Sequence, residues 1–154
     1  MGKLYLVRHA DAGHRKDHDG PDIGRPLSER GQRQADALVD LLGDAGITRL
    51  LSSPYLRCMQ TLVPLGHRLG LPIEDEPLLA EGAGAAGALD LAAGLETTSA
   101  AFCSHGDVIP DILEALLTQG MRRRDELRWQ KASTWVLTWD GGKLAKARYL
   151  PPPA

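Results

Sequence analysis

Residues 3–9 decide the fold class of this chain, and they read Lys3-Leu4-Tyr5-Leu6-Val7-Arg8-His9. A short apolar run that ends at a charged pair is typical of a buried strand. Residues 47–52 and residues 99–104 are two further strand candidates, and the second of them runs into His105 and Gly106. The sequence therefore predicts three buried strands, two of which lead directly to a histidine.

Each predicted strand is followed by a segment with the spacing of an amphipathic helix. Beyond a polar loop over residues 10–27, the first apolar stripe consists of Ala35, Leu38, Val39 and Leu42. These positions lie on one face of a helix, which Ser28 is suited to cap. Ser53 and Pro54 are expected to begin the second helix, and Pro64 is expected to kink it or end it early.

Shorter segments lie between these elements. Residues 71–74 favour a short edge strand, and residues 86–93 favour a short helix. The apolar spacing after Ile109 indicates a third long helix with Pro110 in its first turn. We interpret residues 122–124, which are three arginines, as the solvated end of a helix.

The C-terminal part of the chain predicts a hairpin. Residues 134–139 and 144–150 alternate as strands do, around a turn at residues 140–142. Together with the alternation of strands and helices before it, this predicts an α/β three-layer sandwich. Its central sheet is mostly parallel, with helices on both faces and an antiparallel C-terminal edge hairpin. Residues 1–150 are expected to form one domain, and residues 151–154 a flexible Pro-rich tail.

Composition and charge exclude several classes of function. The chain has 154 residues and a net charge of -2, which argues against a nucleic-acid binder that relies on overall positive charge. No apolar run approaches the ~20 residues that span a bilayer, so no membrane partner is expected. Two cysteines, Cys58 and Cys103, are too few for a disulfide framework, and a cytoplasmic protein is expected.

Side chains that are able to carry positive charge follow all three predicted strands, and they are Arg8, His9, Arg57 and His105. The carboxyl ends of parallel strands meet at one edge of a sheet, where ligands bind. Arg57 is expected in the first turn of a helix, where the helix dipole disfavours a cation unless an anion is bound. Gly106 lets a backbone N–H approach an oxyanion, and the planar fork of arginine suits a phosphoryl group. We therefore predict a phosphoryl-binding site.

Four motifs resemble those of a known family. Leu6-Val7-Arg8-His9-Ala10 is similar to the Arg-His-Gly signature of the histidine phosphatase (phosphoglycerate mutase-like) superfamily. Ala10 replaces the commoner glycine, as in its phosphohistidine phosphatase branch. Residues 25–35 resemble the family's Pro-Leu-Thr/Ser-x-x-Gly-x-x-Gln-Ala segment, and residues 52–61 resemble its Ser-Ser-Pro-x-x-Arg-x-x-Gln-Thr segment. Residues 104–106 resemble its second histidine motif, and the motifs occur in the family's order.

The resemblance implies an activity and a role for individual residues. It implies a metal-independent phosphatase in which His9 is the nucleophile and forms a covalent phosphohistidine. Arg8, Arg57 and His105 would bind the phosphoryl oxygens and stabilise charge in the transition state.

The resemblance also implies an acidic residue in the middle of the chain that protonates the leaving group. Glu81 fits that place and is the candidate general acid, with Asp11 as the alternative. Asp11, His14 and Arg15, all in the long loop, are candidate substrate contacts. The spacing of His14 and His18 resembles that of metal ligands, but no further ligand pattern accompanies it. Neither a metal nor another cofactor is expected.

Two substrate classes stay open. The first is phosphohistidine on a partner protein, because only residues 10–27 and 80–94 are left to build walls around His9, which predicts a shallow cleft. The second is a small phosphoester or nucleotide, because similar domains follow Nudix hydrolases in some actinobacterial proteins. Residues 57–61 resemble the corresponding segment of those domains, so a Nudix hydrolase is a candidate partner. A non-catalytic phosphate-binding module is the alternative from another class.

Overall fold

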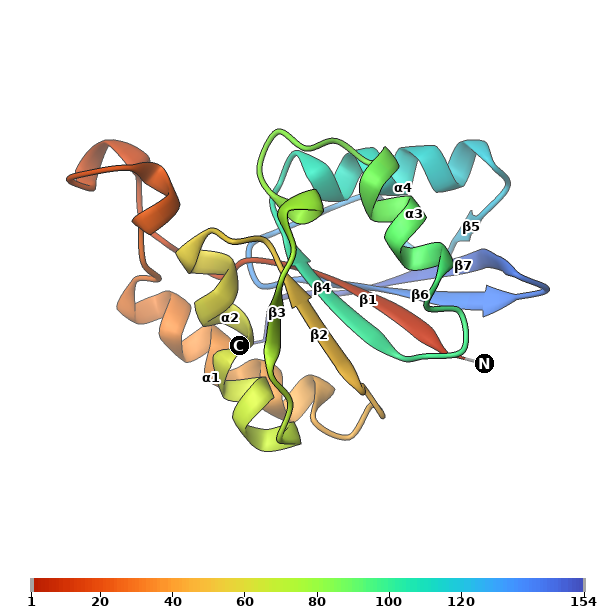
Figure 1. Ribbon diagram of the computed structural model, residues 1–154, viewed down its shortest axis with the longest axis horizontal. Coiled ribbons are helices and arrows are strands. Elements are labelled where there is room, and N and C mark those ends of the chain that lie inside the picture. Colours follow the sequence, from red (N-terminus) through yellow and green to blue (C-terminus); the bar gives the residue numbers. More distant parts are fainter. Residues whose placement is uncertain (1, 154) are drawn as a thin grey trace.

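The computed structural model describes residues 2–153 and places seven strands in one sheet of order β3-β2-β4-β1-β6-β7-β5 (Figure 1). The strands are β1 (Lys3–Arg8), β2 (Arg49–Ser52), β3 (Ile73–Asp75), β4 (Ala100–Ser104), β5 (Arg122–Arg123), β6 (Thr134–Asp140) and β7 (Lys143–Leu150). The α-helices are α1 (Glu29–Leu42), α2 (Leu56–Leu69), α3 (Ala86–Ala93) and α4 (Val108–Thr118). Short 3-10 helices in the loops are η1 (Arg15–Asp17), η2 (Asp22–Gly24) and η3 (Pro77–Leu79).

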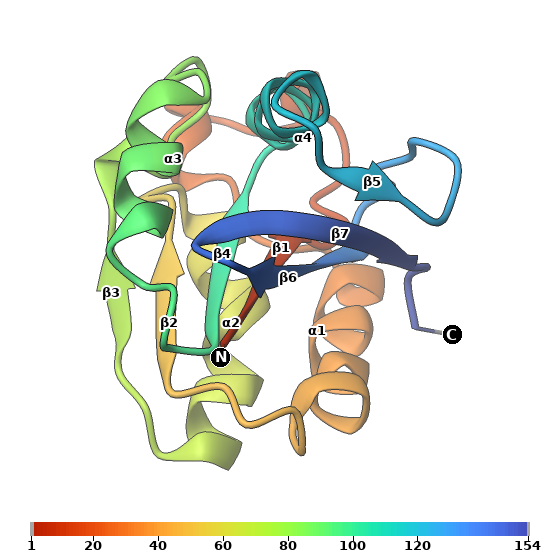
Figure 2. The ribbon, with the colours of Figure 1, turned by 90° about the vertical axis from the view of Figure 1, so that its right-hand side faces the viewer.

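Two helices cover each face of the sheet, as Figure 1 and Figure 2 show, with α3 and α4 on one face and α1 and α2 on the other. The side chains of β1 alternate between these faces. Leu4 and Leu6 are buried in the cluster that includes α3 and α4, whereas Tyr5 and Val7 are buried in the cluster that includes α1 and α2. The predicted three-layer α/β sandwich is confirmed.

The centre of the sheet is parallel and one side of it is antiparallel. β1 pairs in parallel with β4, and β2 pairs in parallel with both β4 and β3. β6 runs antiparallel to β1 and forms the predicted hairpin with β7. The hairpin is not the outermost part of the sheet, because β5 pairs with β7 beyond it.

The prediction that residues 122–124 form the solvated end of a helix is wrong. α4 ends at Thr118, and Arg122 and Arg123 form β5. Met121, directly before them, is 5% exposed and belongs to the core cluster on this face. Burial of that side chain brings the backbone back to the sheet, where the backbone of β5 pairs while its arginine side chains stay exposed.

α2 begins later than the sequence predicts. Its first residue is Leu56, and extended Tyr55 precedes it, so Ser53 and Pro54 do not start the helix. The Ser53 hydroxyl lies 2.8 Å from Nε2 of His105 instead. A contact with a distant histidine thus replaces the local cap that the sequence pattern predicts.

Pro64 does not end α2, which continues to Leu69. Proline cannot donate a backbone hydrogen bond and is unfavourable inside a helix. Leu62 and Leu65, on either side of it, are fully buried in the core. Packing of these side chains offsets the missing hydrogen bond, since most helical stability in proteins comes from tertiary contacts.

The start of α1 is fastened to the residues that follow β1. The Ser28 hydroxyl accepts the Gly31 N–H at 3.0 Å, which confirms Ser28 as the N-cap. The Ser28 N–H donates to the carbonyl oxygen of Asp11 at 2.9 Å. A Cβ at Gly31 would lie 1.9 Å from that same carbonyl oxygen, so only glycine permits this approach. α1 therefore holds the backbone two residues after His9.

The C-terminal residues lie beside α1. Pro152 and Pro153 are half-buried and line shallow hollows with Arg30 and Gln34. Flexibility of residues 151–154 stays a prediction, and Ala154 lies outside the described residues. Within residues 2–153, none of the helices has the length and apolar character needed to cross a membrane.

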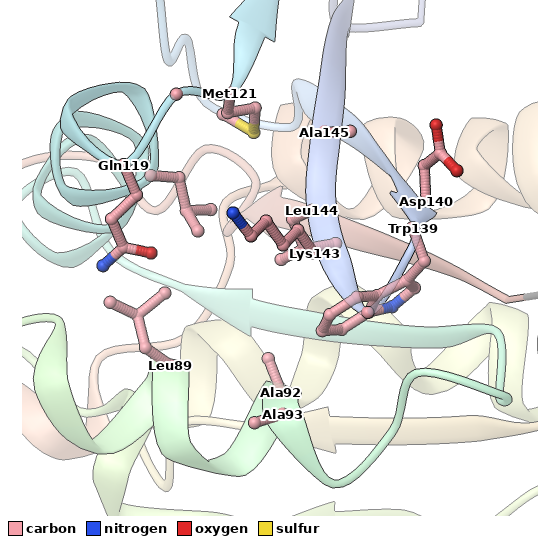
Figure 3. A pocket seen from close by; sticks show the side chains of 13 residues that line it. Leu89, Ala92, Ala93, Gln119, Met121, Trp139, Asp140, Lys143, Leu144 and Ala145 are labelled. Atoms are coloured by element: carbon pink, nitrogen blue, oxygen red, sulfur yellow. The ribbon is translucent and has the colours of Figure 1, made fainter.

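A hollow of about 710 Å³ lies between α3, the end of α4 and the turn from β6 to β7 (Figure 3). Leu89, Met121 and Trp139 line it, together with Gln119 and Lys143. This turn is at the end of the sheet where β1 begins, whereas His9 follows the last residue of β1. The candidate site residues from the sequence do not line this hollow.

Candidate active site

The carboxyl ends of three strands bring the predicted phosphoryl-binding residues together. β1 and β4 pair up to their last residues, and β2 ends beside β4. The segments that follow these strands therefore meet at one edge of the sheet. One hollow of about 520 Å³ is lined there by Arg8, His9, Arg57, His105 and Gly106.

His9 is buried, and its ring is held in one orientation. Its Nδ1 lies 2.8 Å from the carbonyl oxygen of Ala10, and its Nε2 accepts from Arg57 Nε at 3.4 Å. These contacts place the ring hydrogen on Nδ1 and the lone pair on Nε2. Burial lowers the pKa of His9 to about 3, and the charges of Arg57, His105 and Arg8 act in the same direction. His9 is therefore neutral at pH 7, as a nucleophilic imidazole must be.

Arg57 is 1% exposed and reaches from α2 to η2 in the long loop. Its Nη1 donates to the carbonyl oxygen of Asp22 at 3.1 Å, and its Nη2 lies 3.1 Å from Oδ2 of the same residue. Glu81 Oε2 lies 3.7 Å from Nη2, and the Tyr55 ring centroid lies 4.9 Å from the guanidinium carbon. Two carboxylates thus balance a cation that the first turn of a helix disfavours.

Asp22 connects three arginines, although it belongs to none of the four sequence motifs. Besides its contacts with Arg57, its Oδ1 accepts from Arg25 Nε at 2.9 Å and lies 3.4 Å from Arg15 Nε. Burial raises the pKa of Asp22, but the Arg25 hydrogen bond and the charges of Arg57, Arg25 and Arg15 outweigh burial and lower it. No motif marks Asp22, because an irregular loop carries it to the site.

Gly106 makes room for the Arg8 side chain. A Cβ at Gly106 would lie 2.7 Å from Cζ and Nη2 of Arg8, so any larger residue displaces the guanidinium. Arg8 Nη1 donates to the carbonyl oxygen of Trp129 at 2.8 Å. Burial lowers the pKa of Arg8, and the Arg57 charge adds to this effect. An approach of the Gly106 backbone N–H to an oxyanion stays a prediction, and the structure adds that this glycine accommodates an arginine.

His105 lies edge-on to His9, with ring centroids 5.5 Å apart. It is 2% exposed. Its Nε2 lies 2.8 Å from the Ser53 hydroxyl and 3.5 Å from the Cys58 sulfur. Its Nδ1 has no hydrogen-bond partner within residues 2–153.

Buried polar atoms without a partner lie at this hollow or beside the arginines that line it. Four buried side-chain nitrogen or oxygen atoms in residues 2–153 lack a hydrogen bond, and three of them are Arg8 Nε, Asp22 Oδ2 and His105 Nδ1. Asp22 Oδ2 is within ion-pair distance of Arg57 but is not aligned for a hydrogen bond. Arg8 Nε is an obligate donor, and buried donors are almost always paired in folded proteins. An acceptor with several oxygens, such as a phosphoryl group, fits these nitrogens.

Glu81 lies at the hollow and forms an ion pair with the long loop. Its Oε1 accepts from Arg15 Nη2 at 2.9 Å. The N–H of Gly82 donates to Asp107 Oδ2 at 2.8 Å, which ties this segment to the one after β4. In this arrangement the Glu81 side chain accepts a hydrogen bond from Arg15, so a role as general acid requires this contact to open.

The other candidate residues from the loop take different positions. Asp11 does not line the hollow; it accepts from the Ser28 hydroxyl at 2.6 Å and lies 3.5 Å from Lys131 Nζ. The Ser28 hydrogen bond holds the pKa of Asp11 below its usual range. His14 and Arg15 do line the hollow. The structure therefore brings two of the three candidate substrate contacts, His14 and Arg15, to the hollow, but not Asp11, which is also the alternative acid.

The segment before β6 adds a residue that no motif indicates. Lys131 lines the hollow, and the next residue, Ala132, donates its N–H to the carbonyl oxygens of Arg8 and His9 at 3.1 Å each. Ala132 has a φ of 66°, which is uncommon for a residue with a side chain. Arg25 also lines the hollow, and its place in the motif of residues 25–35 was an available signal.

Potential metal ligands do not form a cluster in the described part of the chain. Across residues 2–153, no group of three or more His, Cys, Asp or Glu side chains is arranged to hold a metal ion. The site instead gathers guanidinium and imidazole groups around one hollow. Fold and geometry together define an α/β protein with a hollow rich in guanidinium and imidazole groups at the carboxyl ends of its strands.

Comparison with known proteins identifies the family to which this chain belongs. The sequence profile described as "Histidine phosphatase superfamily (branch 1)" matches residues 4–89. This chain belongs to the histidine phosphatase superfamily.

A relative agrees with this assignment, and solved structures share the fold. The 8-oxo-(d)GTP phosphatase of Mycolicibacterium smegmatis is 39% identical over 157 residues, which cover 97% of this chain and 48% of that protein. The chain thus spans about half the length of this relative. The structure of the protein histidine phosphatase SixA complexed with tungstate has 23% identity and a TM-score of 0.76, over 99% of this chain and 96% of that one. The putative phosphohistidine phosphatase SixA from Agrobacterium tumefaciens has 25% identity and a TM-score of 0.76, over 98% of both chains.

Proposed function

We propose that this chain is a phosphatase that transfers a phosphoryl group first to His9 and then to water. The observation that carries the proposal is a neutral, buried His9 whose Nε2 faces Arg57 while the Ala10 carbonyl holds Nδ1. Arg8 and His105 line the same hollow. Donors therefore lie where the oxygens of a transferring phosphoryl group carry charge, which is the main source of catalysis in phosphoryl transfer.

The reaction has two displacement steps at phosphorus. In the first, His9 Nε2 forms a bond to phosphorus while the bond to the leaving group breaks, and the leaving group takes the electron pair. In the second, a water oxygen attacks phosphorus, the phosphorus–nitrogen bond breaks, and His9 is restored as inorganic phosphate leaves. Arg8 and Arg57 stabilise the charge on the other phosphoryl oxygens in both steps.

The position of Glu81 supports a substrate whose leaving group needs no proton from the enzyme. Its carboxylate accepts from Arg15 at 2.9 Å and does not offer a proton in this arrangement. The imidazole of a phosphohistidine leaves more readily than an alkoxide does. Phosphohistidine on a partner protein is therefore the substrate that we propose, and Glu81 serves as general acid for poorer leaving groups once the Arg15 contact opens.

A nucleoside di- or triphosphate is the second candidate substrate. It is supported by the 39% identity to an 8-oxo-(d)GTP phosphatase over 97% of this chain. Its terminal phosphoryl group also has a leaving group, a phosphate, that departs without a proton. His14, Arg15 and Lys131 at the hollow offer positive or titratable groups for a second phosphate. Association with a Nudix hydrolase belongs to this alternative.

Alkaline quenching during turnover of a radiolabelled phosphate donor tests the proposed chemistry. We expect a phosphoryl-enzyme that is stable in base and labile in acid. His9→Ala should abolish both the label and turnover, whereas His67→Ala, an exposed histidine on α2, should retain them. Binding of phosphate without turnover by the wild-type chain would instead support the non-catalytic module.

A rate comparison separates the two substrates. The ratio kcat/KM is measured for a phosphohistidine-bearing carrier domain and for a nucleoside triphosphate at equal salt concentration. We expect the carrier domain to be preferred. A preference of 100-fold for the nucleotide, about 2.7 kcal/mol of differential transition-state binding, would reverse this order.

A further inference from the structure

Ser53 is a buried serine outside the set of residues assigned to the phosphoryl group. It follows β2, and 0% of its surface is exposed. Its Oγ lies 2.8 Å from His105 Nε2 and accepts the backbone N–H of Tyr55 at 3.2 Å. Within residues 2–153, these two contacts are the hydrogen bonds of this hydroxyl.

The hydrogen of the Ser53 hydroxyl has one acceptor. The Tyr55 N–H is a donor and occupies a lone pair of Oγ, so the Oγ–H is left for His105 Nε2. If Nε2 itself carried a hydrogen, the Ser53 hydrogen would stay unpaired in the interior, which buried hydroxyls avoid. Nε2 is therefore the acceptor of this contact.

An imidazole that accepts at Nε2 carries its hydrogen on Nδ1. In His105 that nitrogen is buried and has no partner in the described residues. His105 lines the same hollow as Arg8 and His9, and its ring lies edge-on to His9. An Nδ1–H at this place is a donor for an oxygen of a phosphoryl group held between Arg8 and Arg57.

We infer that Ser53 is a positioning residue, whose hydroxyl donates to His105 Nε2 and so keeps the ring hydrogen on Nδ1, from which it is donated to the phosphoryl group. The inference rests on the proposed function, because it names a donor for the group that His9 receives. Ser53 does not line the hollow and acts through the tautomer of His105.

Cys58 is the other group at His105 Nε2. Its sulfur lies 3.5 Å from Nε2 and 3.7 Å from the carbonyl oxygen of Ser104. A thiol is a weaker donor than a hydroxyl, and this thiol has the carbonyl oxygen as a second acceptor. Ser53, at the shorter distance, is therefore the group expected to set the tautomer.

Nitrogen NMR of the isotope-labelled wild-type chain measures the tautomer directly. The His105 ring signals are assigned by their loss in His105→Gln, at a pH where the ring is neutral. We expect a protonated Nδ1 and an unprotonated Nε2, and we expect inorganic phosphate to shift Nδ1 more than Nε2. A wild-type ring with its hydrogen on Nε2 overturns the inference, whether or not the chain hydrolyses phosphate compounds.

Three variants at neighbouring positions test the role of the hydroxyl. Ser53→Ala should move the ring hydrogen to Nε2 in a share of the molecules and weaken binding of inorganic phosphate about tenfold. Ser53→Thr keeps a hydroxyl and should restore both properties. Ser52→Ala is the matched control, because the buried Ser52 hydroxyl donates to the Ser53 carbonyl oxygen at 2.8 Å and does not touch His105. It should change neither property.

The outcomes separate this inference from its rivals and from the proposed function. The role of Ser53 is overturned if Ser53→Ala keeps the wild-type tautomer of His105. It is also overturned if only Cys58→Ala changes that tautomer. The expected tautomer and the expected Ser53 dependence of phosphate binding, in a chain without turnover, would support the inference and refute the proposed phosphatase.

Discussion

The surroundings of His9 change the chemistry of an ordinary side chain. An exposed imidazole has a pKa near 6.5, whereas burial and three neighbouring cationic or titratable groups lower the pKa of His9 to about 3. The Ala10 carbonyl oxygen, 2.8 Å from Nδ1, fixes which nitrogen keeps the lone pair. His9 is consequently a neutral, oriented base throughout the range of pH in which most enzymes work.

This burial predicts how stability depends on pH. The unfolded chain protonates His9 near pH 6.5 and the folded chain only near pH 3, so the unfolded state binds more protons between these values. The free energy of unfolding therefore falls as the pH falls, and His9 contributes about 2 kcal/mol of this loss by pH 5. Chemical denaturation at pH 7 and pH 5 measures the loss. His9→Asn should lose less than the wild type, and equal losses would contradict the buried, neutral His9.

Gly106 offers a second prediction at a single residue. Gly106→Ala places a Cβ against the Arg8 guanidinium, 2.7 Å from Cζ in the present arrangement. We expect a loss of about 10- to 100-fold in kcat/KM, because the displaced donor costs the strength of a charged hydrogen bond. The melting temperature should change little, since the end of a flexible side chain can move. Gly87→Ala is the control. Gly87 lies in α3, where the added Cβ would contact the Leu78 side chain, and this variant should keep full activity.

The long loop and the segment after η3 close the hollow from two sides. η2 supplies Asp22 to Arg57, and η1 supplies Arg15 to Glu81. The Arg15 side chain is 63% exposed, and an ion pair this exposed contributes little to stability. The loop is therefore held mainly by the buried Arg57 and Arg25 contacts, and the Arg15 contact is the part that opens most readily.

Replacement of Glu81 tests this element. Glu81→Gln removes the candidate proton donor, which contributes roughly 10²–10⁴-fold where the leaving oxygen needs a proton. We expect hydrolysis of alkyl phosphates to slow far more than hydrolysis of p-nitrophenyl phosphate or phosphohistidine. Glu114→Gln, at an exposed position of α4, should alter none of these rates. Equal losses for all leaving groups would mean that Glu81 holds the loop or the substrate and transfers no proton.

The molecule as a whole carries a net charge of -2, yet it collects cations at one end of its sheet. The parallel pairing of β1, β2 and β4 produces this concentration, because each strand ends at the same edge. Cationic side chains that are far apart in the sequence thus lie together around one hollow. This hollow attracts anions more strongly than the net charge of the chain suggests.

Chelation tests whether these cations suffice for catalysis. Guanidinium and imidazole groups can stabilise the phosphoryl oxygens as a metal ion would. We expect turnover to be unchanged in EDTA relative to the same enzyme without chelator. Loss of activity that one specific metal restores would contradict this and would point to His14 and His18 as ligands.

Much of the fold is predictable because it depends on local periodicity. The apolar run before Arg8 and the alternation over residues 134–139 form β1 and β6, and residues 86–93 form α3 as expected. The errors occur where a distant contact overrides a local pattern. Ser53 bonds to His105 and does not cap α2, and the burial of Met121 draws Arg122 and Arg123 into β5.

The sequence by itself determined the α/β alternation and the presence of Arg8, His9, Arg57 and His105 at the strand ends, since these follow from neighbouring residues. Only the tertiary structure decided which atoms face one another. It joined Arg57 to Asp22 across 35 residues and Ser53 to His105 across 52. Such contacts depend on how loops cross the ends of the sheet, and no local pattern encodes that path. The orientation of His9, the absence of Asp11 from the lining of the hollow and the contact of Ser53 with His105 Nε2 all follow from that path.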